Sequence, residues 1–328
     1  MEQRVLGKTG RRIGVVGLGA WQIGADWGPV SDADAMATLH AAVDAGVTFV
    51  DTADVYGDGR SERLIGRFRH QRPDAGLTVA TKMGRRAQPH RSAAYTLDSF
   101  RAWTDRSRAN LGGGILDLVQ LHCPPSDVYS RDAVFDALDV LVAEGRIAAY
   151  GVSVETCAEA LAALERPGVA TIQIILNCFR QKPLDAVLPA ARAAGVGIIA
   201  RVPLASGLLA GGYDESTTFP PEDHRAYNRN GEAFDVGETF AGVPYEAGLA
   251  AVEELRALVP PGMTMAQLAL RWILMQEAVT TVIAGAKSTV QAQENAAASD
   301  LPRLPAETMT RIATLYDTRI RPFVHQRW

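Results

Sequence analysis

Cysteine is scarce in this 328-residue sequence, which contains only Cys123, Cys157 and Cys178. The three are far apart, and none belongs to a C-x-x-C pair. A disulfide framework needs an even set of cysteines, and a structural zinc site needs ligands at short spacings. The sequence therefore argues against both, and we expect a reducing compartment, the cytoplasm.

Long apolar runs and an excess of one charge are also missing. No stretch approaches the ~20 apolar residues of a membrane-spanning helix, and the N-terminus lacks the apolar segment of a signal peptide. The formal net charge is only -4. Proteins that bind nucleic acid or anionic membranes carry basic patches. We therefore expect no nucleic-acid or membrane partner.

The usual fingerprints of nucleotide binding are absent as well. No G-x-G-x-x-G motif opens a helix after a predicted strand, and no G-x-x-x-x-G-K-[ST] phosphate loop occurs. The sequence therefore argues against a Rossmann domain and a P-loop domain.

What the sequence does contain is a repeated alternation of short apolar segments and helical segments. The predicted strands are 15–19, 47–50, 77–81, 115–121, 148–152, 171–176, 197–200 and 280–284. The predicted helices are 31–45, 61–68, 92–110, 131–144, 156–164, 184–194, 245–258, 264–275, 288–298 and 306–317. Eight such units without a composition break favour a single α/β domain over residues 1–328, a closed (β/α)8 TIM barrel.

Two features lie outside this repeat. Residues 4–6 and 11–13 flank a glycine turn, which predicts an N-terminal β-hairpin that caps the bottom of the barrel. Residues 204–245, after the seventh strand, are rich in Gly, Pro, Asp and Asn. A loop of this length is usually functional or mobile.

Polar side chains follow three adjacent predicted strands at the point where each strand ends. Asp51, Lys82 and His122 come directly after the second, third and fourth strands, and Tyr56 lies in the loop after Asp51. The C-terminal strand ends of such a barrel meet at one face, where active sites are built. We therefore expect these four side chains to converge.

The residue types indicate reduction of a carbonyl group. Asp51 would keep Lys82 charged, and the charged lysine would lower the pKa of Tyr56 from its ordinary value of about 10. His122 would donate a hydrogen bond to the carbonyl oxygen, and Tyr56 would supply a proton to it. The hydride must come from a cofactor, because no side chain provides one.

Further motifs make the sequence resemble the aldo-keto reductase superfamily over nearly its whole length. They are Gly17-Leu18-Gly19-Ala20-Trp21, Asp51-Thr52-Ala53-x-x-Tyr56-Gly57, Thr81-Lys82, Leu121-His122, Gly151-Val152-Ser153, Pro203-Leu204-Ala205-Ser206-Gly207-Leu208-Leu209, and Ala284-Gly285-Ala286-Lys287 followed by Glu294-Asn295. The resemblance implies a catalytic tetrad of Asp51, Tyr56, Lys82 and His122. It implies NADPH bound across the barrel mouth, with NADH left open, and no metal.

The resemblance also implies which residues contact the cofactor and the substrate. Those for the cofactor are Gly19, Ala20, Ser153, Gln173, Arg201, Pro203, Leu204, Ser206, Gly207, Leu208, Gly285, Lys287, Gln291, Glu294 and Asn295. Ser153 and Gln173 would hold the nicotinamide carboxamide, residues 204–208 would wrap the pyrophosphate, and the last five would bind the adenosine end. Trp21 and Trp27 would line the pocket for a small carbonyl substrate.

Three positions depart from the family pattern. Many relatives have asparagine where Val154 stands, an aromatic ring where Arg201 stands and arginine where Gln291 stands. A guanidinium group can stack on a ring, but its charge would also affect the oxidised, cationic nicotinamide. Lys287 would supply a cation for the 2′-phosphate in place of the missing arginine.

Two other functions stay open from the sequence. One is a cofactor-sensing regulatory or interaction protein, like the potassium-channel β subunits of the same superfamily, which lack the histidine present here as His122. The other is a barrel isomerase or aldolase that uses Lys82 as a Schiff-base nucleophile. Taken singly, Lys82 also fits a solvated strand end, His122 a core histidine and Lys287 a surface charge. The natural substrate, the direction of reaction and oligomer formation are left open.

Overall fold

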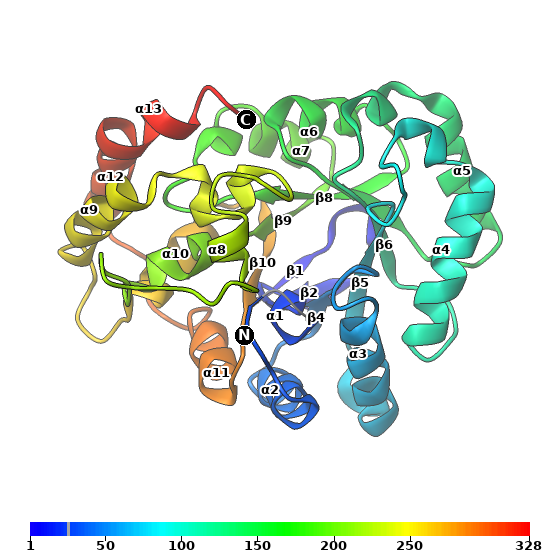
Figure 1. The fold of residues 1–328 in the computed structure, drawn as a ribbon, viewed down its shortest axis with the longest axis horizontal. Helices are drawn as coiled ribbons and strands as arrows, with labels where there is room; N and C mark the ends of the chain where they lie inside the picture. Colours follow the sequence, from blue (N-terminus) through cyan, green and yellow to red (C-terminus); the bar gives the residue numbers. More distant parts are fainter. Residues whose placement is uncertain (25–26) are drawn as a thin grey trace.

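A closed barrel of parallel strands forms the centre of the molecule, with helices around it (Figure 1). The computed structural model describes residues 1–24 and 27–328. The strands close in the order β10-β3-β4-β5-β6-β7-β8-β9. They are β3 (Val16–Gly19), β4 (Phe49–Asp51), β5 (Thr78–Met83), β6 (Leu118–His122), β7 (Tyr150–Ser153), β8 (Val169–Ile175), β9 (Gly197–Arg201) and β10 (Val279–Gly285). The predicted TIM barrel is confirmed.

The described chain has thirteen α-helices, which comprise the ten predicted ones in the predicted order and three short ones that were not predicted, at 21–24, 224–227 and 321–324. The thirteen are α1 (Trp21–Gly24), α2 (Asp32–Asp44), α3 (Arg60–Gln71), α4 (Leu97–Asn110), α5 (Asp132–Ala143), α6 (Cys157–Leu164), α7 (Val187–Ala193), α8 (His224–Tyr227), α9 (Tyr245–Arg256), α10 (Met265–Leu274), α11 (Thr289–Ala297), α12 (Ala306–Leu315) and α13 (Arg321–Val324). Local sequence sets several starting points, because a serine or threonine side chain accepts a hydrogen bond from a backbone N–H three residues later. The residues that do so are Ser31, Thr96, Thr156, Thr264 and Ser288.

Some predicted boundaries were wrong. The helix predicted from residue 92 begins at Leu97, because Ser92–Ala94 forms a separate 3-10 turn. The helix predicted from residue 184 begins at Val187, again after a short turn. Lys82 lies within β5 rather than after it, and Trp21, predicted in a loop, opens α1.

The N-terminal hairpin closes the bottom of the barrel, as predicted. It consists of β1 (Gln3–Val5) and β2 (Arg12–Gly14), paired antiparallel. Leu6 and Ile13 are fully buried in a cluster with barrel residues that include Phe49. Gly7 approaches β8 so closely that a Cβ atom there would lie 2.1 Å from the carbonyl oxygen of Ala170. Only glycine fits this contact.

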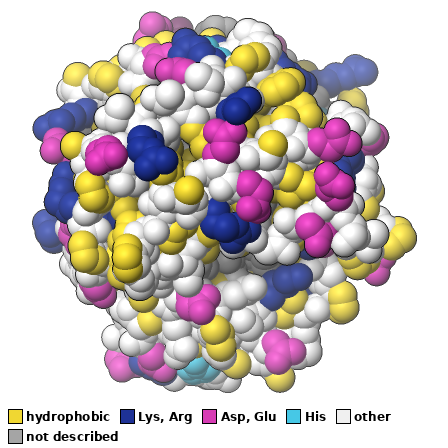
Figure 2. Space-filling view, turned by 90° about the vertical axis from the view of Figure 1, so that its left-hand side faces the viewer, with side chains coloured by type: hydrophobic (Ala, Val, Ile, Leu, Met, Phe, Trp, Pro, Cys, Tyr) yellow, Lys and Arg dark blue, Asp and Glu magenta, His cyan; other side chains and the backbone are white. Residues whose placement is uncertain are grey.

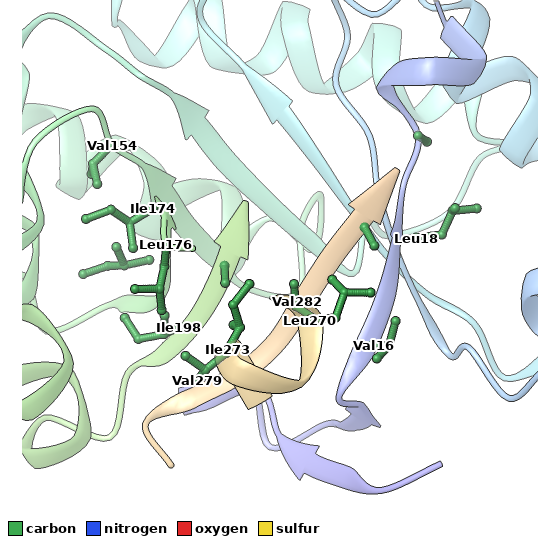
Figure 3. Packing of buried hydrophobic residues seen from close by; sticks show 14 of the residues in the cluster. Val16, Leu18, Val154, Ile174, Leu176, Ile198, Leu270, Ile273, Val279 and Val282 are labelled. Atoms are coloured by element: carbon green, nitrogen blue, oxygen red, sulfur yellow. The ribbon is translucent and has the colours of Figure 1, made fainter. Parts of the chain in front are cut away.

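A second apolar layer lies between the barrel and the helices. Figure 3 shows Leu270 and Ile273 of α10 beside Val279 and Val282 of β10, and all four are buried. Burying one such side chain contributes about 1.5–3 kcal/mol. This layer therefore holds the strand ends that carry the site.

The surface mixes charges of both signs. On the face shown in Figure 2, basic and acidic side chains are interspersed with hydrophobic ones, in line with the net charge of -4. Within residues 1–24 and 27–328, no helix combines the length and the apolar composition needed to cross a membrane.

Candidate active site

A cavity of about 620 Å³ lies at the C-terminal ends of the barrel strands. Small-molecule sites typically have volumes of about 300–1,000 Å³. Nearly all of the predicted site residues line this cavity. They are Gly19, Ala20, Trp21, Trp27, Asp51, Tyr56, His122, Ser153, Gln173, Arg201, Pro203, Leu204, Ser206, Gly207, Gly285, Lys287, Gln291, Glu294 and Asn295.

Two predicted site residues lie behind the cavity wall. Lys82 is buried beside Tyr56, with 1% of its surface exposed. The Leu208 side chain is fully buried against Gly248, where a Cβ atom would lie 2.5 Å from Leu208 Cδ2. The side chain of Leu208 therefore belongs to the core.

Asp51, Lys82 and Tyr56 form one chain of contacts. The Lys82 ammonium is ion-paired with the Asp51 carboxylate, donates to the backbone oxygen of Thr52 at 2.9 Å and lies 3.2 Å from the Tyr56 hydroxyl. Burial lowers the pKa of Lys82, but the negative charge of Asp51 and the contact with Tyr56 outweigh burial, so the pKa is raised. Lys82 is therefore charged. A charged amine is a poor Schiff-base nucleophile.

Two glutamines hold the other side of the Asp51 carboxylate. Gln173 Nε2 donates to Asp51 Oδ2 at 2.9 Å, and Gln120 Nε2 donates to the same oxygen at 3.3 Å. Hydrogen bonds to a carboxylate favour its ionised form and fix its orientation. Gln173 therefore supports Asp51 while it also lines the cavity.

Tyr56 is held by aromatic neighbours. Its ring stacks nearly parallel on Trp21, at a centroid distance of 5.9 Å, and meets the ring of His122 edge-on at the same distance. Burial raises the pKa of Tyr56, and Lys82 opposes this rise without reversing it. The sequence predicted a pKa below the ordinary value, because it gave no measure of burial. The hydroxyl therefore keeps its proton at neutral pH, as a proton donor must.

His122 presents a neutral imidazole. Burial, followed by the charges of Arg85 and Lys82, lowers the pKa of His122 well below its ordinary value. Its Nδ1 atom is buried and has no hydrogen-bond partner among the described residues. A buried polar atom without a partner is uncommon, and it marks a place where a ligand or a water molecule bonds.

Two glycines fix the loop that carries Tyr56. A Cβ atom on Gly24, at the end of α1, would lie 2.8 Å from Tyr56 Cβ. Gly57 has a φ of +57°, and a Cβ atom there would lie 2.4 Å from the carbonyl oxygen of Gly24. Because neither position accepts a side chain, α1 and the loop approach closely and orient the tyrosine ring.

The predicted substrate-pocket tryptophans come together above Tyr56. Trp21 and Trp27 meet edge to face with centroids 5.7 Å apart. His224 of α8 packs against both, at 4.8 Å from Trp21 and 4.4 Å from Trp27. The sequence did not single out His224, because its segment has no regular pattern. These rings give one part of the cavity an aromatic wall.

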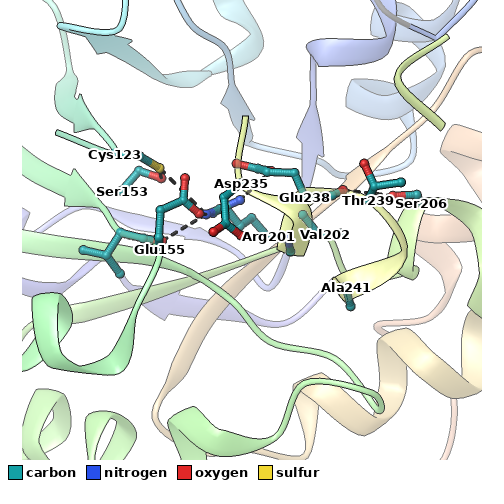
Figure 4. A network of polar contacts seen from close by, with 12 residues as sticks. Cys123, Ser153, Glu155, Arg201, Val202, Ser206, Asp235, Glu238, Thr239 and Ala241 are labelled. Carbon is teal, nitrogen blue, oxygen red and sulfur yellow. Dashed lines mark hydrogen bonds and ion pairs between the residues drawn. The ribbon is translucent and has the colours of Figure 1, made fainter. Parts of the chain in front are cut away.

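A charged cluster that the sequence did not predict lines the same cavity as the tetrad, and Figure 4 shows its residues Glu155, Arg201 and Glu238. Arg201 Nη1 lies 2.6 Å from the Glu238 carboxylate, and Arg201 Nη2 lies 3.0 Å from Glu155 and 2.9 Å from the backbone oxygen of Val154. Arg85 reaches the same carboxylates, at 3.1 Å from Glu155 and 3.9 Å from Glu238. Arg85, Arg201 and Glu238 line the cavity.

This cluster also brings Cys123 near the two carboxylates, within 4.8 Å for the possible ligand atoms of Cys123, Glu155 and Glu238. Both carboxylates already pair with arginines. Burial raises the pKa of Cys123 to about 12, so its thiol stays protonated. A metal ligand must be the thiolate. The arrangement is therefore better described as an ion-pair cluster than as a metal site.

Another part of the cavity wall is basic. Lys287 donates to the backbone oxygen of Trp27 at 2.8 Å, and Arg225 pairs with Asp223 at 2.5 Å and lies over the Trp27 ring. Burial and the nearby charge of Arg225 lower the pKa of Lys287. Two cations that repel each other in one cavity suit an anionic ligand, such as a phosphate group.

The predicted adenosine-side residues gather where β10 passes into α11. The Lys287 backbone N–H donates to Gln291 Oε1 at 2.8 Å. Asn295 Nδ2 donates to the backbone oxygen of Gly285 at 3.2 Å. Together with Glu294 they line the cavity. The motif after the last strand therefore forms one continuous piece of the wall.

Comparisons with known proteins agree with this geometry. The family model described as the Aldo/keto reductase family matches residues 15–317. L-galactose dehydrogenase of Arabidopsis thaliana is 30% identical over 308 residues, which cover 91% of this chain and 88% of that protein. The chain belongs to the aldo/keto reductase family and is an NAD(P)H-dependent oxidoreductase.

Solved structures show the same fold. The glycerol dehydrogenase of Gluconobacter oxydans superposes with a TM-score of 0.77 at 29% identity, covering 94% of this chain and 93% of that one. An aldo-keto reductase of Klebsiella pneumoniae, solved in complex with NADPH, superposes with a TM-score of 0.71 at 23% identity, covering 98% and 99%. At 23% identity, the similarity to the Klebsiella pneumoniae protein shows a shared fold and nothing more.

Proposed function

We propose that this protein reduces an aldehyde or ketone to an alcohol with NADPH, and that Tyr56 donates the proton. The observation that carries this proposal is the Asp51–Lys82–Tyr56 chain of contacts, which ends at the wall of the cavity beside the neutral His122. A positioned general acid and a carbonyl-orienting donor are the groups that this reduction needs from the protein.

The cavity fits a nicotinamide dinucleotide. Arg201 Nε is buried and has no partner within the described part of the chain, although Arg201 lines the cavity. Gly207 and Gly285 also line the cavity, where a Cβ atom would lie 2.2 Å from the Tyr213 hydroxyl oxygen and 1.9 Å from Gln22 Nε2, respectively. NADPH, when bound, supplies the hydride to the carbonyl carbon.

The side chains have separate tasks in this step. His122 orients the carbonyl by hydrogen bonding to its oxygen, since a neutral imidazole carries a proton to donate. Tyr56 transfers its hydroxyl proton to the same oxygen as negative charge develops there. Lys82, kept charged by Asp51, stabilises the phenolate that remains until solvent returns the proton. General-acid catalysis of this kind contributes roughly 10²–10⁴-fold to the rate.

Lys287 favours NADPH over NADH. Arg225 is already paired with Asp223, so the ammonium of Lys287 is the charge that the extra 2′-phosphate of NADPH would neutralise in this part of the cavity. Ser153 and Gln173 would hold the carboxamide, and the backbone of residues 204–208 would contact the pyrophosphate. Gln291, Glu294 and Asn295 would hold the adenosine end.

The test is oxidation of NADPH and of NADH, followed by absorbance, with a panel of carbonyl compounds. The panel starts from an activated aromatic aldehyde. It adds glyceraldehyde, pyridoxal and, in the reverse direction with NADP⁺, L-galactose, because similar proteins carry glycerol, pyridoxal and galactose in their names. Turnover with an alcohol product and a preference for NADPH supports the proposal. Tight NADPH binding without turnover on any member favours the cofactor-sensing alternative.

A further inference from the structure

Arg201 links three separate segments of the described chain. It ends β9, and its guanidinium group reaches Glu155 after β7 and Glu238 in the long loop before α9 (Figure 4). Arg201 and Glu238 are both buried, at 6% exposed each, yet both line the cavity. Their charges therefore act on whatever ligand occupies it.

The cluster is close to the reacting groups. The charge of Glu238 contributes to the raised pKa of Tyr56, and Tyr56 in turn affects the pKa of Arg201. Burial raises the pKa of Glu238, but Arg201 and Arg85 outweigh burial and lower it, so Glu238 is ionised. A fixed negative charge thus stands against a fixed positive charge in the wall of the cavity that Tyr56 and His122 also line.

Hydride transfer changes the charge of the nicotinamide ring by one unit, since the oxidised ring is a cation and the reduced ring is neutral. A fixed charge beside the ring therefore changes the affinity for one form and leaves the other nearly unaffected. Arg201 alone would disfavour the oxidised form. A carboxylate paired with Arg201 would cancel that effect.

We propose that Glu238 is a positioning residue that neutralises Arg201 beneath the nicotinamide and thereby sets the relative affinity of the protein for NADP⁺ and NADPH. This inference rests on the proposed function, because it requires the nicotinamide to bind beside Arg201. The long loop after β9, which carries Glu238, would then help to determine whether the protein binds NADP⁺ or NADPH more tightly.

The test measures dissociation constants for NADP⁺ and NADPH by titration calorimetry on the full chain, and compares their ratio between variants. In Glu238→Gln the side chain keeps its shape and loses its charge. We expect Kd(NADP⁺)/Kd(NADPH) to rise by at least about tenfold, because at an effective dielectric constant of about 20 one unit charge still changes an affinity about tenfold from about 12 Å away. Loss of loop order alone would weaken both forms equally and leave the ratio unchanged.

Two further variants test whether the ratio follows the charge beside the ring. Arg201→Gln should lower the same ratio, because Arg85 alone then faces both Glu155 and Glu238, and the cluster carries a net negative charge. The double variant E238Q/R201Q should return the ratio to within about twofold of wild type, since the pair is again neutral overall. Glu232→Gln is the matched control in the same loop, where the exposed carboxylate accepts a hydrogen bond from Asn230, and it should leave the ratio unchanged.

The possible outcomes distinguish a failure of this inference from a failure of the proposed function. If wild type binds both forms and E238Q leaves the ratio unchanged or lowers it, the inference is wrong while the proposed function stands. If wild type binds neither form, the proposed function fails and the inference falls with it. Opposite shifts in the two single variants, cancelled in the double, establish the role of Glu238.

Discussion

Trp328 donates its indole N–H to the carboxylate of Asp235, 3.0 Å away, across 93 positions of sequence. The guanidinium group of Arg180 lies over the Trp328 ring, 3.5 Å from its centroid. Asp235 also caps the 3-10 turn Val236–Glu238 by accepting a hydrogen bond from the backbone N–H of Gly237. The tail residue therefore holds the loop that brings Glu238 to Arg201.

Replacement of Trp328 should loosen this loop. We expect Trp328→Ala to lower the free energy of unfolding by about 3 kcal/mol, in the range for truncating a buried aromatic side chain, and to raise the Kd for NADPH several-fold. Trp328→Phe keeps the ring and loses the hydrogen bond, so it should cost only about 1 kcal/mol. Urea unfolding and NADPH titration measure both effects. Equal NADPH affinity in wild type and Trp328→Ala would contradict a role for the tail at the site.

Lys82 should be required for both activity and folding stability. Lys82→Met leaves Asp51 buried and unpaired, which costs about 3–5 kcal/mol of stability, and removes the charge beside Tyr56. We expect kcat to fall by at least about 10²-fold. The double variant D51N/K82M is the control, because it removes both charges. It should regain much of the stability in denaturant unfolding and none of the activity, whereas regained activity would contradict the assigned role.

Asp54 should make stability depend on pH. Its carboxylate is fully buried, neither oxygen has a partner in the described part of the chain, and burial together with Glu62 raises its pKa to about 7. A raised carboxylate pKa means that the folded state binds the proton more tightly than the unfolded state. Stability is therefore lost as pH rises from the ordinary value toward about 7, and the loss is complete above it.

The measurement is the difference in unfolding free energy between Asp54→Asn and wild type, taken from about pH 5 to about pH 8. The stability of the variant relative to wild type should rise by about 2.6 kcal/mol over this interval, at 1.36 kcal/mol per pKa unit. Asp58→Asn is the control from the same loop, because Asp58 is exposed and its pKa is lowered by Arg86. If the difference in unfolding free energy between Asp54→Asn and wild type stays constant over this pH range, the raised pKa of Asp54 is contradicted.

Strand ends made most of the fold and the tetrad predictable from sequence. Apolar runs that stop at Asp51 and His122 indicate buried strands, and parallel strands in a barrel bring such ends together whatever the helices do. The third strand of the barrel runs past Lys82 to Met83, so Lys82 lies inside the strand and not directly after it. Lys82 still lies near the C-terminal end of the strand, at the same end of the barrel as Asp51 and His122. Serine or threonine caps set the start of five helices in the same local way.

Contacts across the long loop could not be predicted, because no local pattern sets them. Glu238 and Arg225 lie in a segment without periodicity, so the sequence gave no partner for either. Arg85 and Glu155 were different, since each follows a strand end by two or three residues and could have been included. The pKa of Tyr56 was wrong in direction for a related reason, because burial depends on the packing of Trp21 and His122 around the ring.

The measurement that tests the central claim most directly compares NADPH oxidation by wild type and by Tyr56→Phe, with an activated aromatic aldehyde as substrate. The phenylalanine ring keeps the stacking on Trp21 and lacks only the hydroxyl, so NADPH affinity should stay within about twofold of wild type while kcat falls by at least about 10²-fold. If Tyr56→Phe turns over at the wild-type rate, Tyr56 is not the proton donor, and the mechanism proposed here is wrong.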